Sequence, residues 1–321
     1  MTQTFSDSIK FSQAAEEWLE IVMNQNKYST YVKYRTLYYT HIAEILGSYS
    51  ISQIDDTQFQ IDAAFQLSDS MKKSIYCVVN QILKYAWKKY SIQSTPLKRD
   101  KYKSRKKRIE IFSKNEQSRL ITSLYNNNDR YKTAVILCLN TGLRIGELCA
   151  LKWDDIDFNN FTISVNRTVQ RIKTQESFPK TLLLETEPKS MSSIREIPIS
   201  KAIFFLLTKQ CNHGPYIFGG EKPLEPRTLQ YQFKKILSEA GICNKNFHVL
   251  RHTFATNCIE NETDIKSLSE ILGHSDVKIT LNRYVHPTMD SKRRHIERLG
   301  DFYEQICDIG LAKSESVSSQ D

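Results

Sequence analysis

The sequence lacks several features that would place it in common classes of protein. Over 321 residues it has no run of about eighteen apolar residues, which a membrane-spanning helix needs. Its N-terminus has no basic segment followed by an apolar one, so we expect no export signal. Its seven cysteines are scattered through apolar stretches without C-x-x-C spacing, which is typical of reduced core thiols. We therefore expect a cytoplasmic protein that needs no disulfide and no metal.

Positive charge is concentrated in one short segment. The formal net charge is +9, and eight lysines and arginines between residues 98 and 108 supply most of it, against the single acid Asp100. A basic run of this density favours a polyanion, because each phosphate that it neutralises releases condensed counterions. The alternative is a solvated linker. We predict DNA contacts from Lys98, Arg99, Lys101, Lys103, Arg105, Lys106, Lys107 and Arg108.

The first ninety residues predict a small domain made of helices. Apolar residues recur at helical spacing over residues 9–22, 31–46 and 75–86, and a shorter pattern covers 55–66. The second pattern ends at Gly47, a residue that commonly stops a helix. Four helices of this kind make a compact all-α domain.

The chain after residue 109 has a different pattern. Residues 161–172 and 181–199 alternate like strands, whereas the segments around them have helical spacing. The chain is long enough for two cores, so we predict a mainly α fold with a small β-sheet. The predicted parts are a helical domain at 1–97, a basic linker at 98–108, an α+β domain at 109–311 and a disordered tail at 312–321.

Four short segments contain residue types that bind phosphate or move protons. They are Thr141-Gly-Leu-Arg144-Ile-Gly-Glu147-Leu, Glu187-Pro-Lys189-Ser, His248-Val-Leu-Arg251-His252, and Leu272-Gly-His274 with Tyr284 ten residues further on. Each has an ordinary structural explanation when taken alone. An arginine after a glycine turn usually forms an ion pair, and histidines four residues apart often pack or cap a helix. The combination and its order are what indicate a function.

Together these segments resemble the tyrosine recombinase (phage integrase) family, and the resemblance covers nearly the whole chain. The motifs stand in the family's order: an arginine in a TGxRxxE turn, a hairpin lysine, an HxLRH box, an LGH box and a tyrosine. The spacing from His274 to Tyr284 is most like that of integrases from phages and conjugative transposons. The resemblance implies an all-α SAM-like core-binding domain followed by an α+β tyrosine recombinase catalytic domain.

The resemblance implies that four of the matched residues bind the scissile phosphate. Arg144 and Arg251 suit this role because guanidinium groups are always charged and bind phosphate in bidentate fashion. His248 and His274 would donate hydrogen bonds to the same oxygens. His248 would also accept the proton of the nucleophile.

The resemblance makes Tyr284 the nucleophile of strand cleavage, which would give a 3′-phosphotyrosine and a free 5′ hydroxyl. Lys189 would protonate the departing 5′ oxygen, with Lys173 and Lys180 as alternatives near the same predicted hairpin. The supporting residues would be Glu147 and His252. Because the covalent link conserves the energy of the broken bond, the reaction would need no cofactor.

The resemblance also implies partners. We expect double-stranded DNA with paired half-sites, a homotetramer in the synaptic complex, and strand exchange through a Holliday junction. An accessory directionality factor is a further candidate, and no membrane is involved.

Several other functions fit part of the pattern. An Xer-like resolvase or invertase would share the chemistry and would lack an arm-site-binding domain. We expect no such domain here, because the core-binding pattern begins near residue 9. A type IB topoisomerase would use the same phosphotyrosine without paired sites, and a non-catalytic DNA-binding relative would need no chemistry. The His248 and His252 pair suggests a zinc hydrolase, but the glutamate of an H-E-x-x-H site is missing.

Overall fold

The computed structural model describes residues 9–304 apart from 55–66, 93–95, 98–108, 126–128, 175–179, 188–190, 211–213, 286–288, 290–291 and 294–295. The basic residues at 98–108, Lys189, the helix predicted at 55–66 and the tail predicted at 312–321 therefore lie outside the described residues. The chain divides into two compact units. One comprises Met1–Arg108 with Gln170–Leu184, and the other comprises Ile109–Val169 with Glu185–Asp321.

The N-terminal part of the first unit is helical. Its elements are α1 (Phe11–Gln25), α2 (Tyr28–Leu37), a π-helical turn (Tyr38–Ile42), α3 (Ala43–Leu46), a 3₁₀ turn (Ile51–Gln53) and α5 (Asp69–Tyr90). The buried residues of α1 and α5 recur every three or four positions, as one apolar stripe per helix requires. This confirms the helical patterns predicted at 9–22 and 75–86. The pattern at 31–46 forms α2, the π-helical turn and α3 in unbroken succession.

The strands form two small sheets. Antiparallel β1 (Ile156–Asp157), β2 (Thr162–Val165) and β5 (Arg195–Pro198) make one, and β3 (Thr168–Lys173) pairs with β4 (Thr181–Thr186) in the other. The strand predicted at 161–172 is thus split between two sheets. The break falls at Asn166 and Arg167, whose side chains both hydrogen-bond the Asp155 carboxylate. The predicted mainly helical fold with a small β component is confirmed.

The core of the second unit is built around α7 (Arg130–Thr141), in which five successive residues from Ala134 to Cys138 are buried. Five helices pack against it: α6 (Lys114–Tyr125), α8 (Ile145–Ala150), α9 (Lys201–Thr208), α10 (Pro226–Glu239) and α11 (His248–Glu260). A helix surrounded in this way is apolar on every side, which explains the continuous apolar run Ala134–Cys138.

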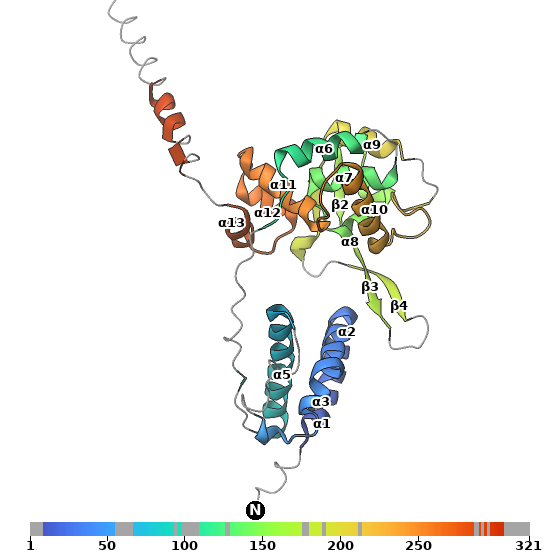
Figure 1. The fold of residues 1–321 in the computed structure, drawn as a ribbon, viewed down its shortest axis with the longest axis vertical. Helices are drawn as coiled ribbons and strands as arrows, with labels where there is room; N and C mark the ends of the chain where they lie inside the picture. Colours follow the sequence, from blue (N-terminus) through green and yellow to red (C-terminus); the bar gives the residue numbers. More distant parts are fainter. Residues whose placement is uncertain are drawn as a thin grey trace, which may run out of the picture. The chain divides into compact units, whose positions relative to one another are not determined.

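Two further helices complete the part of the second unit that holds the predicted site. They are α12 (Ile265–Leu272) and α13 (Val277–Tyr284), and Figure 1 shows them grouped with α11, with which both are in contact. The helix α13 was not predicted. Its start is marked by Asp276, whose carboxylate accepts a hydrogen bond of 2.8 Å from the Lys278 N–H.

The structure bears on two further expectations, one about membrane-spanning helices and one about the cysteines. Within the described ranges, every helix is too short or too polar to cross a lipid bilayer. Cys138 and Cys149 are buried free thiols, as expected for core cysteines, whereas Cys243 is exposed and contradicts the prediction that all are in the core. Cys243 lies in the loop between α10 and α11, where its neighbours Asn244 and Asn246 are exposed too.

Candidate active site

The turn that carries Arg144 is fixed by glycine. The helix α7 ends at Gly142, which takes a left-handed conformation with φ +64°. A Cβ atom at this position would lie 2.5 Å from Cδ1 of Phe254, so a larger residue does not fit. The chain then leaves the turn and begins α8 directly after Arg144.

The C-terminal end of α12 gathers three guanidinium groups. Three consecutive carbonyl groups there each accept a hydrogen bond from a different arginine. The pairs are Arg195 Nε with Ile271 O (2.6 Å), Arg251 Nη2 with Leu272 O (2.7 Å) and Arg144 Nη2 with Gly273 O (3.0 Å). The last carbonyls of a helix have no partner within the helix and carry partial negative charge, so they attract cations.

A buried carboxylate links two of these arginines. Glu147 Oε1 lies 2.6 Å from Nη1 of Arg144, and Glu147 Oε2 lies 2.9 Å from Nη2 of Arg195. Burial acts to raise the pKa of Glu147, but the charges of Arg195 and Arg144 outweigh it and hold the pKa below its usual range. The predicted supporting residue Glu147 is therefore an anion placed between two cations.

Sequence reasoning missed Arg195. It lies on β5 two residues before the buried Ile197, and side chains two apart point to the same face of a strand. An arginine at an inward-facing position of the alternation Arg195–Ile197 was the signal that could have identified it. Thr280 of α13 was also missed, although its hydroxyl lies 2.8 Å from Nδ1 of His274.

Arg251 is the most buried of the cations, with 2% of its surface exposed. Its Nη1 donates to Gly142 O at 2.7 Å, and its Nη2 lies 3.0 Å from Nε2 of His274. Desolvation and the nearby charge of Arg144 lower the pKa of Arg251 to about 10, so it stays charged at neutral pH. His274 is thereby held between Arg251 and Thr280.

Tyr284 is the last residue of α13, and its side chain is buried at 7% exposure. Its hydroxyl lies 2.8 Å from Nδ1 of His252. Burial raises the pKa of Tyr284 above its usual value, although Arg251 and Arg283 act to lower it. The hydroxyl is therefore protonated at neutral pH.

The three histidines of the cluster are uncharged at neutral pH. The rings of His248 and His252 meet edge to face with centroids 4.7 Å apart. Desolvation of the rings, followed by repulsion from neighbouring groups that include Arg251, lowers the pKa of His248, His252 and His274 to about 4. No group of three His, Cys, Asp or Glu side chains within the described residues is arranged to hold a metal ion.

Seven predicted residues thus lie in one connected cluster of the second unit. They are Arg144, Glu147, His248, Arg251, His252, His274 and Tyr284. The eighth, Lys189, and the basic residues predicted at 98–108 lie outside the described residues. Of the alternative lysines, Lys173 ends β3 and Lys180 directly precedes β4.

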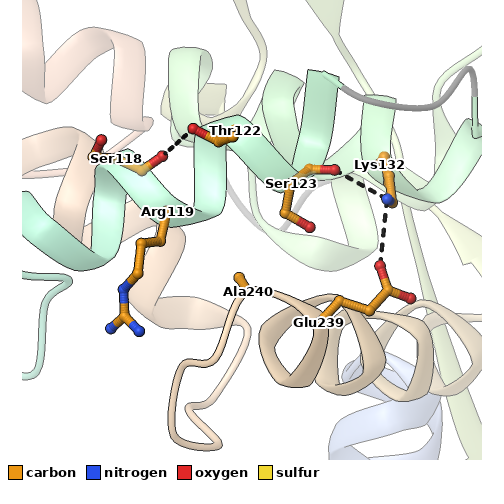
Figure 2. A pocket seen from close by; sticks show the side chains of 7 residues that line it. All are labelled: Ser118, Arg119, Thr122, Ser123, Lys132, Glu239 and Ala240. Atoms are coloured by element: carbon orange, nitrogen blue, oxygen red, sulfur yellow. Dashed lines mark hydrogen bonds and ion pairs between the residues drawn. The ribbon is translucent and has the colours of Figure 1, made fainter.

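A separate groove between α6 and α10 shares no residue with this cluster. Figure 2 shows Lys132 at one end of it, directed toward Glu239 and the Ser123 carbonyl. The Lys132 ammonium lies 3.3 Å from the Glu239 carboxylate and 3.0 Å from Ser123 O. Because the Lys132 ammonium is paired with groups of the protein itself, we do not take this groove as the candidate site.

The cluster has the composition of a site for an anionic phosphoryl group. Two guanidinium groups supply fixed positive charge, and neutral imidazoles donate or accept single hydrogen bonds. A phenolic hydroxyl beside them is a potential nucleophile. The composition is therefore compatible with transfer of a phosphoryl group to a tyrosine.

Known proteins share the sequence and the fold. Residues 110–291 match the phage integrase family, and residues 10–61 match its N-terminal SAM-like domain. A tyrosine recombinase XerC-like protein of Caldanaerobacter subterraneus subsp. tengcongensis is 31% identical over 89% of this chain and 81% of its own length.

Solved structures share the fold at lower identity. The Tn1549 transposon integrase in complex with transposon right end DNA has a TM-score of 0.75 at 20% identity, covering 91% of this chain and all of that one. A lambda integrase tetramer bound to a Holliday junction has a TM-score of 0.64 at 17% identity, covering 89% and 82%. The family match spans more than half of the chain and includes the whole arginine–histidine–tyrosine cluster. The chain therefore belongs to the phage integrase family of tyrosine recombinases.

Proposed function

We propose that this site-specific recombinase cleaves DNA by attack of the Tyr284 hydroxyl on a phosphodiester. The attack gives a 3′-phosphotyrosine link and a free 5′ hydroxyl, and the reverse reaction rejoins strands without an added cofactor. The observation that carries the proposal is that the Tyr284 hydroxyl, hydrogen-bonded to His252, lies within the electrostatic influence of Arg251, which itself contacts His274.

Arg144, Arg251 and His274 are proposed to bind the non-bridging oxygens of the phosphate. Negative charge accumulates on these oxygens as the tyrosine attacks, and donors fixed in advance stabilise it strongly in a site shielded from water. Arg144 keeps 36% of its side chain exposed while Glu147 and Gly273 orient it, so it can reach a ligand without changing its anchor.

Proton transfer completes the proposed reaction. Lys189 gives a proton to the departing 5′ oxygen, a general-acid role that suits an ammonium group. By the family resemblance, His248 would donate a hydrogen bond to the phosphate and accept the proton of the nucleophile. Glu147 and His252 support the cluster.

The substrate is proposed to be double-stranded DNA with paired half-sites. The lambda integrase relative is a tetramer on a Holliday junction, and the Tn1549 relative is bound to transposon end DNA. By likeness to them we propose a homotetrameric synaptic complex, in which the basic residues at 98–108 contact the DNA backbone. An accessory directionality factor would be a further partner. A recombinase works where the genome is, so the proposal places the protein in the cytoplasm.

The proposed division of labour follows the predicted parts. Residues 1–97 form the core-binding domain, 98–108 the linker, 109–311 the catalytic domain and 312–321 a tail. The helical segment after Tyr284 exposes Ile296, Leu299 and Phe302. Because such side chains are usually covered, we propose that this segment packs on a neighbouring protomer of the synaptic complex.

The biological role is proposed to be integration of a mobile element, with an Xer-like resolution or inversion role as the second candidate. The XerC-like relative, of which the chain covers 81%, favours the second candidate, and the fold of the transposon integrase favours the first. Sequencing the DNA beside the gene separates them, because an integrated element ends in repeats that flank the gene.

The test of the proposed chemistry is Tyr284→Phe with a nicked suicide DNA that traps the covalent intermediate. The variant removes one oxygen, so it should bind DNA like the wild type and form no covalent adduct. Cleavage by Tyr284→Phe would show that another residue is the nucleophile. A wild-type protein that binds the nicked DNA and traps nothing would point to a non-catalytic relative. Relaxation of supercoiled DNA without paired sites would indicate a type IB topoisomerase.

A further inference from the structure

The Tyr284 hydroxyl and Nδ1 of His252 form a direct hydrogen bond of 2.8 Å. We infer that His252, through Nδ1, is the catalytic residue that takes the proton from Tyr284 during strand cleavage. The inference rests on the proposed function, and it replaces His248 in that step. His252 touches the reacting oxygen, whereas sequence reasoning gives it only a supporting role.

The protonation states and the tautomer of His252 together set the direction of this hydrogen bond. The pKa of His252 is lowered to about 4, first by desolvation and then by His248, Arg283 and Arg251, so the ring is neutral at pH 7. The pKa of Tyr284 is raised by burial, so its hydroxyl carries its proton. In the tautomer with the ring proton on Nε2, the Tyr284 hydroxyl donates and Nδ1 accepts, which is the direction that proton transfer requires and the tautomer that the inference assigns.

Geometry distinguishes the two histidines of α11. His248 and His252 are four residues apart and lie on the same side of the helix. The pKa of each is lowered to about 4, so neutrality does not separate them. The hydrogen bond from Tyr284 goes to His252, and His248 meets the edge of the His252 ring. His248 is thus left for the phosphate oxygens.

The cations around His252 make its basicity depend on DNA. A protonated His252 ring would lie near the positive charges of Arg251 and of Arg283 on α13, which disfavour a further positive charge. His248, on the same helix, would add to this repulsion only when it is itself protonated. A phosphodiester bound to Arg251 brings a negative charge into the same space and favours the protonated ring. We expect the base to become effective only when the substrate is present.

The atoms of the step balance. The Oη–H bond of Tyr284 breaks and its proton moves to Nδ1 of His252, while Oη forms a bond to phosphorus. The bond from phosphorus to the 5′ oxygen breaks, and that oxygen takes a proton from Lys189. When the strand is rejoined, His252 returns its proton to Oη of Tyr284.

The test compares His252→Asn with His248→Asn in single-turnover cleavage of the suicide DNA, each carrying either tyrosine or a fluorinated tyrosine at position 284. Asparagine keeps a hydrogen-bond acceptor near the position of Nδ1 but holds no proton. Fluorination lowers the pKa of the nucleophile and so removes the need for a base. We expect H252N to lower the cleavage rate by about 100-fold or more, and the fluorinated tyrosine to restore most of this loss. The loss in H248N should remain with either nucleophile.

The pH profile is a second readout that a structural role would not change. The wild-type cleavage rate should fall at low pH as His252 becomes protonated, and this fall should be absent in H252N. DNA binding by each variant shows that it is folded. If H252N does not bind DNA, His252→Ala supplied with free imidazole replaces it, and recovery that depends on imidazole supports the inference.

Three results would overturn the inference. They are wild-type cleavage by H252N, restoration of H248N instead of H252N by the fluorinated tyrosine, and no recovery of His252→Ala with imidazole. Failure of the proposed function looks different, because the wild-type protein would then form no covalent adduct at all.

Discussion

Arg195 and Glu147 form a buried ion pair beneath the candidate phosphate site. Nη2 of Arg195 lies 2.9 Å from Oε2 of Glu147, and the two side chains are 6% and 5% exposed. Arg195 also donates to the carbonyls of Ile271 and Ser193. It therefore joins β5, the start of α8 and the end of α12, and through Glu147 it acts as a positioning residue for Arg144.

Replacing Arg195 should destabilise the protein strongly. Arg195→Ala leaves the Glu147 carboxylate buried with one cation fewer, and breaking such a pair costs about 3–5 kcal/mol. The measurement is urea unfolding followed by circular dichroism. The matched control is Arg298→Ala, because the ion pair of Arg298 with Glu262 is more than half exposed and should be worth no more than about 1 kcal/mol. Equal losses in the two variants would contradict a special role for Arg195.

The lowered pKa values of the histidines predict how stability depends on pH. His248, His252 and His274 titrate near 6.5 when unfolded and near 4 when folded. Between these values the unfolded chain binds more protons, so the stability is complete above about pH 6.5 and falls as the pH drops toward 4. We expect a lower melting temperature at pH 5 than at pH 7.5, and a smaller difference in His274→Gln. A melting temperature that rises on acidification to pH 5 would contradict the prediction.

Gly142→Ala should disturb both stability and cleavage. The left-handed conformation costs an alanine about 1–2 kcal/mol, and its Cβ would lie 2.5 Å from Phe254 and 2.9 Å from Leu272. Because Arg144 follows two residues later, its guanidinium should move as well. Gly300→Ala is the control, since a Cβ there meets nothing within 4 Å. The measurements are thermal melting and trapping of the covalent adduct, and a Gly142→Ala protein as stable and active as Gly300→Ala would show that the turn adapts.

Glu185→Gln should slow cleavage by disturbing the strand that leads to Lys189. Glu185 lies on β4, where its carboxylate lies 2.6 Å from the Tyr216 hydroxyl, 3.3 Å from Lys152 Nζ and 3.6 Å from Arg167 Nε. A DNA in which sulfur replaces the 5′ bridging oxygen has a leaving group that needs no general acid. This substrate should restore cleavage by Lys189→Ala and by Glu185→Gln. Recovery in the first variant alone would mean that Glu185 does not act through Lys189.

The helices α1 and α5 were predictable because each buries an apolar stripe that its own sequence repeats. The apolar residues of α1 and α5 recur every three or four positions, and this spacing is the same for any amphipathic helix, whatever it packs against. Strand pairing was not predictable in the same way. β2 pairs with β5, thirty residues away in sequence, and the two residues that follow β2 bond the side chain of Asp155.

Most residues of the cluster could be named from sequence motifs, although Arg195 and Thr280 could not, and the contacts between the residues were not predictable. Arg144, Arg251, His274 and Tyr284 stand in motifs that a single sequence displays. The bonds between them join residues far apart in the chain, such as Arg144 to Gly273. Nothing in the spacing of His252 and Tyr284 indicates their hydrogen bond, because it depends on how α13 packs against α11.

The carbonyl groups of Ile271, Leu272 and Gly273 at the end of α12 should also reduce the entropy that is lost when DNA binds. Long cationic side chains that must be immobilised by a ligand cost about 0.5–1.5 kcal/mol each in lost rotamer freedom. Arg144, Arg195 and Arg251 are ordered by this eight-residue helix when the protein folds. In the proposed function Arg144 and Arg251 bind phosphate, so the binding of phosphate does not have to order these two again. If these arginines bind phosphate as proposed, part of the affinity for DNA is set during folding, and loosening α12 should appear in calorimetry as a less favourable entropy of binding.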